Sequence, residues 1–509
     1  MDMNILRHSV AVNETVFSQT LEQPLDISIS LPDYCPDMVS ILKCRVTPYI
    51  SSKNVNDHNV LLEGSAVVNI IYMTENGLLR GIEYVYPFSK SVDTKIDCTD
   101  ACVFVAAKSE YINCRALTPR KADVHGSISV CVKVVCKKTA DVLVDIDEPH
   151  VQVNHKDLRS TTQLDCNEKY MIIDEEFTLD NSKQAVGGIL RHDLYTTVKD
   201  CKIIGNKAVV KGEATLDVLY YSTGDDLCRF TETVPFSQIV EADGFAEDCE
   251  CKAKIEIASK DLRVQNAGED NSGFYLNAKL CVTVFSLCNN EVPIVVDAFS
   301  TDYETELVKN NINIEWIQQS ICEKFLCKKN LEFTDMTVQE IVDFRCEASM
   351  SDVQLNNKQL IINGIVLICV LFTDKEGRHH YSERPVEFKY CCEVDTEPEG
   401  FRCEPIIDAL ASSYTITGDN CIEARVELCV NADLYAVEHE MAVCDIKVLE
   451  NERKKVSTKG ALVIYYAKCN ESVWSIARKY NTSPVHIKQV NSLENDLLCE
   501  DKTLLIPCK

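Results

Sequence analysis

The chain alternates apolar and polar positions in one pattern that occurs three times. In the first copy, residues 61–90, an apolar β-branched run leads through a polar turn at Asn76-Gly77 into a second run that closes at Pro87. The second copy, 208–238, and the third, 360–390, keep this order. Two short runs of this kind around a polar turn predict a pair of antiparallel strands. We therefore expect three equivalent β-hairpins.

Two marker residues recur in all three copies and align them. Glycines near the start of each hairpin are spaced by 148 and 152 residues, and cysteines in a later apolar run by 150 and 148. These markers are Gly64, Gly212 and Gly364, and Cys131, Cys281 and Cys429. The repetition predicts a mainly β multidomain protein in which one β-rich domain is present three times. We assign the copies to residues 1–150, 160–300 and 331–448.

Within the first copy, the pattern predicts strands interrupted by one short helical turn. Alternation over Leu25–Leu31 predicts a strand, and the apolar runs 102–107 and 128–136 predict two more. Pro36 breaks the pattern, and Asp37 can cap a helical turn formed by the next six residues, MVSILK. Each copy is therefore expected to be rich in strands.

Two connectors separate the copies, and a third joins the last copy to the C-terminal segment. The first, 139–181, is acidic and mixed in character. The second has no glycine or proline over Asp302–Asn330 and carries a broad apolar face, so 301–330 is predicted to be a helical connector. We interpret it as a helix packed on its neighbouring domain; a partner-binding helix is the alternative. The charged stretch NERKKVSTK indicates a linker over 449–459.

Composition restricts the partners and the compartment. The formal net charge of −27 repels phosphate backbones and anionic lipid, so we expect no nucleic-acid binding and no membrane insertion. No apolar run reaches the length of about 18 residues that a membrane span needs, and the first residues lack a signal-peptide pattern. This predicts a cytoplasmic protein. Its 27 cysteines are then expected to stay reduced and to serve mostly as small core residues.

No catalytic, cofactor or metal site is expected. His439-Glu440 begins a zinc-protease pattern, but Val443 stands where the second histidine is required. The phosphate-binding, dinucleotide-binding and G-x-S-x-G motifs are absent from the sequence. Abundant Asp and Glu leave a carboxylate pair open in three dimensions, but no motif nominates one. Closely spaced cysteines lack the C-x-x-C spacing of structural zinc sites: Cys249 with Cys251, Cys322 with Cys327, and Cys391 with Cys392.

The first copy carries a specific family resemblance. Its segments LPDYCPDMVSILKCR, LLEGSAVVNIIY and YPFSK resemble the SPOCS domain, which occurs in spore-envelope proteins of endospore-forming bacteria. The second and third copies keep the glycine, hairpin and proline markers. In place of the LPDYCPD segment they have NSKQAVGGILRHDL and MTVQEIVDFRCEA. If that segment forms a contact surface, only the first copy presents it in the family's form.

The last 50 residues, 460–509, follow a strand–helix–helix–strand order. The run ALVIYYAK predicts a strand, and Ser472 can cap a helix over VWSIARKYN. Ser483-Pro484 starts a second helix, and TLLIP forms the closing strand. With the motifs WSIARKYNTS, IKQVNSL and LLIP in place, this segment resembles a LysM domain. The resemblance implies a small α+β (βααβ) fold.

The resemblance also implies a binding groove, because LysM domains bind N-acetylglucosamine glycans between two loops. Here the family's Gly-Asp-Thr is Asn470-Glu471-Ser472, and its Pro-Gly-Gln is Glu500-Asp501-Lys502. Side chains thus replace two glycines and make one rim acidic, which favours protein recognition over sugar recognition. Asn and Asp tolerate the left-handed backbone that such glycines adopt. The expected groove residues are Asn470, Glu471, Ser472, Val473, Trp474, Ser492, Leu493, Glu500 and Asp501.

SPOCS-like domains followed by a LysM-like domain resemble the organisation of the SipL family. This resemblance implies a non-enzymatic sporulation scaffold in the mother-cell cytoplasm, at the forespore surface and in the spore coat. Its implied partner is the spore-coat morphogenetic ATPase SpoIVA, with other coat proteins as further partners. The alternative is an envelope protein that binds peptidoglycan or cortex through the LysM-like domain. A hydrolase with a glycan-targeting module would need a catalytic domain that the sequence does not show.

Overall fold

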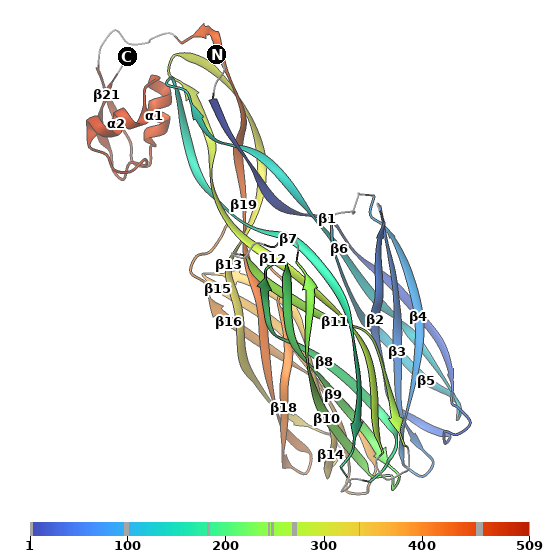
Figure 1. Ribbon diagram of the computed structural model, residues 1–509. Coiled ribbons are helices and arrows are strands. Elements are labelled where there is room, and N and C mark those ends of the chain that lie inside the picture. The colour runs from blue at the N-terminus through green and yellow to red at the C-terminus, as the bar shows by residue number, and fades with distance from the viewer. Residues whose placement is uncertain are drawn as a thin grey trace.

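The chain folds into three β-sandwich units whose longest strands join in a common stalk, with a small helical domain at the stalk tip (Figure 1). The computed structural model describes residues 4–507 except 57, 96–100, 181–183, 243–244, 246–248, 267–271, 335 and 455–461. Alternating β-branched runs build nearly every element, because they bury one face of each strand and leave the other face for solvent or a neighbour. The expected mainly β multidomain fold with a C-terminal α+β domain is confirmed.

The first unit consists of two antiparallel three-stranded sheets packed face to face. One sheet has the order β1-β6-β5 and the other β2-β3-β4. Its core is made of alternate, fully buried residues such as Leu62 and Val68 on β3 and Val130 and Val132 on β6. The strands are β1 (Asn4–Ser30), β2 (Met38–Asn56), β3 (Asn59–Thr74), β4 (Leu79–Asp93), β5 (Cys102–Thr118) and β6 (Lys121–Asp147).

The second and third units repeat this topology. The second pairs its strands as β7-β12-β11 and β8-β9-β10, and the third as β14-β15-β16 and β13-β19, with β17 and β18 both beside β19. The second unit contains β7 (Val151–Thr178), β8 (Val186–Ile204), β9 (Lys207–Ser222), β10 (Leu227–Glu241), β11 (Glu250–Gln265) and β12 (Gly273–Ser300). The third contains β13 (Tyr303–Glu332), β14 (Glu340–Asn356), β15 (Gln359–Thr373), β16 (His379–Glu393), β17 (Gly400–Cys403), β18 (Ile406–Gly418) and β19 (Cys421–Arg453).

The expected hairpins are confirmed as β3–β4, β9–β10 and β15–β16. Gly77 has the positive φ of 74° that the first hairpin turn needs, and Gly377 takes the same role in the third with a φ of 78°. The register pairs each marker glycine with a phenylalanine across the hairpin. Equivalent residues can therefore be counted from Gly64, Gly212 and Gly364 in all three units.

The stalk is built from one two-stranded ribbon of each unit: β1/β6, β7/β12 and β13/β19 (Figure 1). These strands are 27 to 33 residues long and extend beyond the sandwiches. Their apolar side chains meet at equivalent places of the three ribbons. Two sets of these buried residues are Val142, Ile294 and Ala442, and Leu143, Val295 and Val443. The short turns from β6 to β7 and from β12 to β13 lie at the tip.

Both predicted helices outside the C-terminal domain are wrong. Residues 38–43 begin strand β2, in which Ile41 pairs with Tyr72 of β3. Residues 301–330 fall in strand β13, which pairs with β19 along its length. The absence of glycine and proline permits a long strand as well as a helix, and the alternate positions Ile312 and Ile314 are buried in the stalk. Pairing with β3 and β19 satisfies the backbone hydrogen bonds that a helix would otherwise make internally.

The remaining connectors are also largely strand. The first, 139–181, is occupied by the end of β6 and the whole of β7, which starts at Val151, before the expected domain boundary at residue 160. The expected linker 449–459 begins inside β19, which ends at Arg453, and its residues 455–459 lie outside the described part of the chain. No described helix is long and apolar enough to cross a membrane.

The cysteines differ from expectation in one respect. Cys249, which directly precedes β11, forms a disulfide with Cys288 of β12. Most described cysteines do serve as small core residues: some, such as Cys369, are buried, and many half-buried ones, such as Cys44 and Cys346, pack on the cores. The disulfide contradicts the expectation of reduced thiols. Glu250 pairs with Leu287 where β11 begins, so the next residues outward, Cys249 and Cys288, come together.

Candidate functional site

The C-terminal domain has the predicted strand–helix–helix–strand order. Strand β20 (Leu462–Ala467) pairs antiparallel with β21 (Lys502–Pro507), and helices α1 (Val473–Tyr480) and α2 (Pro484–Asn491) lie between them in sequence. Ser472 caps α1 by accepting a hydrogen bond from the Ser475 amide, and Pro484 opens α2. Ile476 and Ile487 belong to the buried core.

The two loops that were expected to frame a groove are bonded directly to each other. The amide of Asn470 donates to the carbonyl of Leu498 at 2.7 Å, and the amide of Val473 donates to the carbonyl of Asp496 at 2.8 Å. A third bond runs from the Leu498 amide to the Glu471 carbonyl at 3.1 Å. Backbone groups that could hold a ligand between the loops are thus paired with one another.

Several predicted groove residues have structural roles instead. Val473, in the first turn of α1, is fully buried in the domain core. Leu493 packs on the same core. Ser472 and Ser492 form the N-cap of α1 and the C-cap of α2. Asn470 is exposed and adopts the expected left-handed conformation, with φ of 65°.

Two carboxylates of the expected acidic rim are engaged in local hydrogen bonds. The Glu471 carboxylate accepts from the Tyr465 hydroxyl at 2.5 Å and from the Lys468 amide at 3.1 Å. The Tyr465 hydrogen bond lowers the pKa of Glu471. Asp501 accepts from the Cys469 amide at 2.7 Å, so its carboxylate holds the first loop in place. Glu500 is exposed.

Trp474 does not face the loops but fixes the domain to the stalk. Its ring packs edge-on against Phe299 of β12, with centroids 5.0 Å apart, and its indole N–H donates to Asp297 at 2.9 Å. Arg478 on the same helix forms an ion pair with Asp297 at 2.6 Å. Phe299 is fully buried within the core of the C-terminal domain. The sequence analysis places Trp474 in the expected groove and gives no signal for its partner in the stalk.

The outer face of the β20/β21 sheet is apolar and exposed. Ile464 and Tyr466 expose 60% and 78% of their surface, and Leu462 and Leu505 lie on the same face. These four residues, which we call the outer sheet patch, were absent from the predicted site. Their signal in the sequence is that LVIYY is apolar at every position, so both faces of the strand are apolar. A patch of this kind is a surface for contact with another macromolecule.

A second notable region, here called the hub, lies where the three sandwich units meet. Arg45, Asp193 and Arg345 occupy the same place in the three units, because each pairs with the residue five positions after its marker glycine. Asp193 forms ion pairs with both arginines. Arg191 of the second unit and Asp343 of the third also occupy equivalent positions, and they form an ion pair at 2.9 Å.

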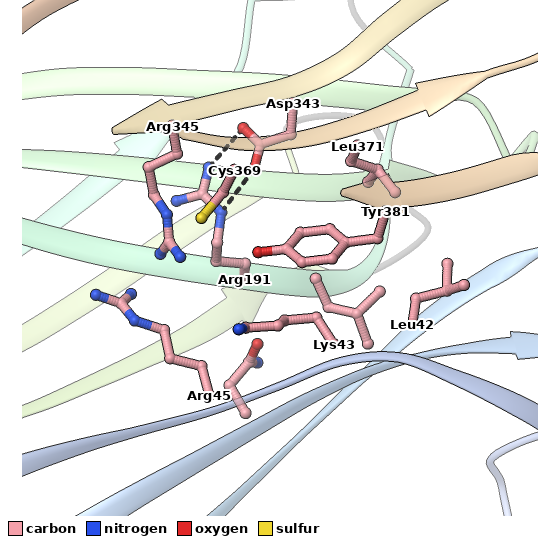
Figure 2. A pocket seen from close by; sticks show the side chains of 11 residues that line it. Leu42, Lys43, Arg45, Arg191, Asp343, Arg345, Cys369, Leu371 and Tyr381 are labelled. Carbon is pink, nitrogen blue, oxygen red and sulfur yellow. Dashed lines mark hydrogen bonds and ion pairs between the residues drawn. The ribbon is translucent and has the colours of Figure 1, made fainter. Parts of the chain in front are cut away.

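A small cavity opens beside these ion pairs (Figure 2). Lys43, Arg45, Arg191 and Arg345 line it together with Asp343 and Tyr381, and they come from β2, β8, β14 and β16. Burial alone would raise the pKa of Asp193, but Arg45, Arg191 and Arg345 outweigh it and hold that pKa well below its usual range. Each of the four basic side chains that line the cavity forms an ion pair with an acidic residue of the protein. The hub therefore acts as a structural junction. No described cluster of His, Cys, Asp or Glu is placed to hold a metal ion.

Comparison with known protein families identifies the domains. A family described as "SipL, SPOCS domain" matches residues 37–117 and 185–265, and the LysM domain family matches 465–507. The first two matches cover β2–β5 and β8–β11; the third unit has the same topology outside these ranges. No curated protein and no solved structure matches the chain. The chain therefore contains two SPOCS domains of the SipL type and a C-terminal LysM domain, which confirms its resemblance to the SipL family.

Proposed function

We propose that this protein is a non-enzymatic sporulation scaffold that binds the spore-coat morphogenetic ATPase SpoIVA. It acts in the mother-cell cytoplasm at the forespore surface and helps to assemble the coat there. The LysM domain is the docking module, and other coat proteins bind elsewhere on the three units. The domain content, SPOCS and LysM, supports a role in sporulation.

One observation favours a protein partner over a glycan. The outer sheet patch is exposed, whereas the two loops of the LysM domain are hydrogen-bonded to each other. Aromatic and aliphatic side chains such as Tyr466 and Ile464 are the type that anchors protein–protein interfaces. Backbone bonds such as Asn470 to Leu498 occupy the groove in which LysM domains take sugars. The docking surface is therefore assigned to the sheet rather than to the loops.

Calorimetry with the full chain and a purified SpoIVA-type ATPase tests this assignment. Ile464→Arg and Tyr466→Ser should each weaken binding by about 2 kcal/mol, roughly thirtyfold, because they remove exposed anchors without entering the core. The matched control is Val485→Ser, which changes an exposed apolar residue on helix α2. Equal affinity of all three variants and the parent chain would contradict docking through the sheet.

Glycan binding is the alternative function, because the LysM family match itself favours it. The same calorimetry with a chitin oligosaccharide should give no heat, and the full chain should not sediment with purified insoluble peptidoglycan. Retention on peptidoglycan that Asn470→Ala abolishes would overturn the proposal and return the site to the loops.

A further inference from the structure

Four cysteines gather at one end of the second unit. Cys201 lies near the end of β8, Cys249 directly precedes β11, Cys251 is the second residue of β11, and Cys288 lies on β12. Cys249 and Cys288 are joined by a disulfide, whereas the sulfur atoms of Cys201 and Cys251 are 2.7 Å apart without being bonded. A surface pocket lined by Cys201, Cys249 and Cys251 opens directly onto this group.

The two cysteine pairs have different positions in the sandwich. Cys249 and Cys288 sit on neighbouring strands of one sheet. Cys201 belongs to the opposite sheet, so a bond between Cys201 and Cys251 would join the two sheets at their open edge. Cys251 pairs in register with Ser286, two residues from Cys288, which places the reduced pair beside the oxidised one.

The thiol pair is polarised. The hydrogen bond between Cys201 and Cys251 lowers the pKa of Cys251 and raises the pKa of Cys201. Cys251 is therefore the thiol that ionises first, and Cys201 is the partner held next to it. A thiolate beside a second thiol and accessible from a pocket is the arrangement of a redox-active dithiol.

We propose that Cys201 and Cys251 form a redox-active dithiol that reacts with low-molecular-weight disulfides. The Cys251 thiolate attacks one sulfur of the small disulfide, whose S–S bond breaks and releases one thiolate. Cys201 then loses its proton to solvent and attacks the Cys251 sulfur of the mixed disulfide, releasing the second thiolate. The protein dithiol gives up two electrons, and the small disulfide is reduced to two thiols.

Closure of this bond would link the two sheets of the second unit beside the existing disulfide. It would occur when the surroundings change from reducing to oxidising, because the small-disulfide pool then drives the exchange. The inference is independent of SpoIVA binding, since the dithiol lies in the second unit and the outer sheet patch lies in the LysM domain.

Glutathione buffers of increasing oxidised fraction test the proposal on the full chain. After each incubation, remaining thiols are blocked by alkylation and the digested chain is mapped by mass spectrometry. A peptide pair linked through Cys201 and Cys251 should accumulate as the oxidised fraction rises. The oxidised protein should also unfold at a temperature several degrees higher than the reduced form.

Two variants assign the roles of the two thiols. Cys201→Ser should trap a glutathione adduct on Cys251, whereas Cys251→Ser should leave Cys201 largely unmodified. The control is Cys444→Ser, a half-buried stalk cysteine whose thiol donates to the Ala442 carbonyl. Circular dichroism confirms that each variant is folded. Failure of the Cys201–Cys251 link to form in the folded parent chain, or an adduct on Cys201 in place of Cys251, would overturn the proposal.

Discussion

At each marker glycine, the hairpin backbone passes directly under a phenylalanine ring. A β-carbon built on Gly64 would lie 2.5 Å from the ring of Phe88 and 2.6 Å from the Tyr49 carbonyl oxygen. Gly212 meets Phe236 and the Thr197 carbonyl in the same way. Glycine recurs at this position because a side chain would clash with the ring and the carbonyl, not because the backbone has an unusual angle. The pattern reveals the position, and only the cross-strand register reveals the reason.

Replacing Gly212 by alanine should destabilise the second unit by about 1–3 kcal/mol, because the added methyl group overlaps a ring and a backbone carbonyl. The measurement is the urea concentration at which the full chain loses half of its β-sheet signal. Gly418→Ala is the matched control, since a β-carbon there would approach nothing closer than 4.0 Å. Equal midpoints for the two variants would show that the ring moves aside freely.

Among the elements, the hairpins and the LysM fold were predictable because each is specified locally. Alternation, an Asn-Gly turn and caps such as Ser472 act within a few residues of the chain. Strand β13 was not predictable, because a long strand and a helix both tolerate a stretch without glycine and proline. Its conformation depends on pairing with β19, whose partner residues lie 89 to 150 positions away, from Glu332 with Cys421 to Tyr303 with Arg453. The same holds for β2, whose first residues are extended because β3 lies beside them.

The candidate binding site was likewise predictable only in part. Family motifs located the two LysM loops, but they could not indicate that the loops bond to each other or that Glu471 bonds to Tyr465. The attachment of Trp474 to Phe299 joins a helix to a strand of another unit, and nothing near either residue in the sequence indicates it. The outer sheet patch was visible as an all-apolar strand but was not part of the predicted site.

Trp474→Ala should release the LysM domain from the stalk while leaving its fold intact. The change removes the ring contact with Phe299 and the hydrogen bond to Asp297 but spares the domain core around Ile476. A loss of about 1–3 kcal/mol would increase opening of this contact roughly ten- to a hundredfold. Hydrogen exchange at the last residues of β12 measures it. His486→Ala, on an exposed position of α2, is the control, and unchanged exchange in Trp474→Ala would refute the attachment.

Across the whole molecule, the three units depend on ion pairs formed at equivalent positions. The repeat predicts that Arg45, Asp193 and Arg345 correspond, but not that they meet in space. Asp193, Arg345 and Arg191 are buried, so removal of Asp193 takes a counter-charge from arginines that lie away from water. Stability of the assembly therefore depends on Asp193 remaining ionised.

Asp193→Asn should cost about 3–5 kcal/mol at pH 7, because it removes the buried carboxylate that pairs with Arg45, Arg191 and Arg345. The pKa of Asp193 is lower in the folded than in the unfolded chain, so its contribution is complete above the usual carboxyl pKa of about 3.9 and is lost as the pH falls below it. Urea unfolding between pH 7 and pH 3 should show this loss in the parent chain and a flatter profile in the variant. Asp225→Asn, in a more exposed pair with Arg80, should change stability by less than about 1 kcal/mol. Identical profiles for Asp193→Asn and the parent chain would contradict the role of the hub.

The charges at the hub also constrain how such a molecule can arise. Three identical copies of the first or third unit would bring three arginines together, and three copies of the second would bring three aspartates together. Neither group of three like charges could be buried, because it would contain no counter-charge. The arginine–aspartate–arginine arrangement therefore requires three copies that differ in sequence, which gene duplication within one chain provides. Once the copies had diverged in this way, the second could no longer be exchanged with either of the other two.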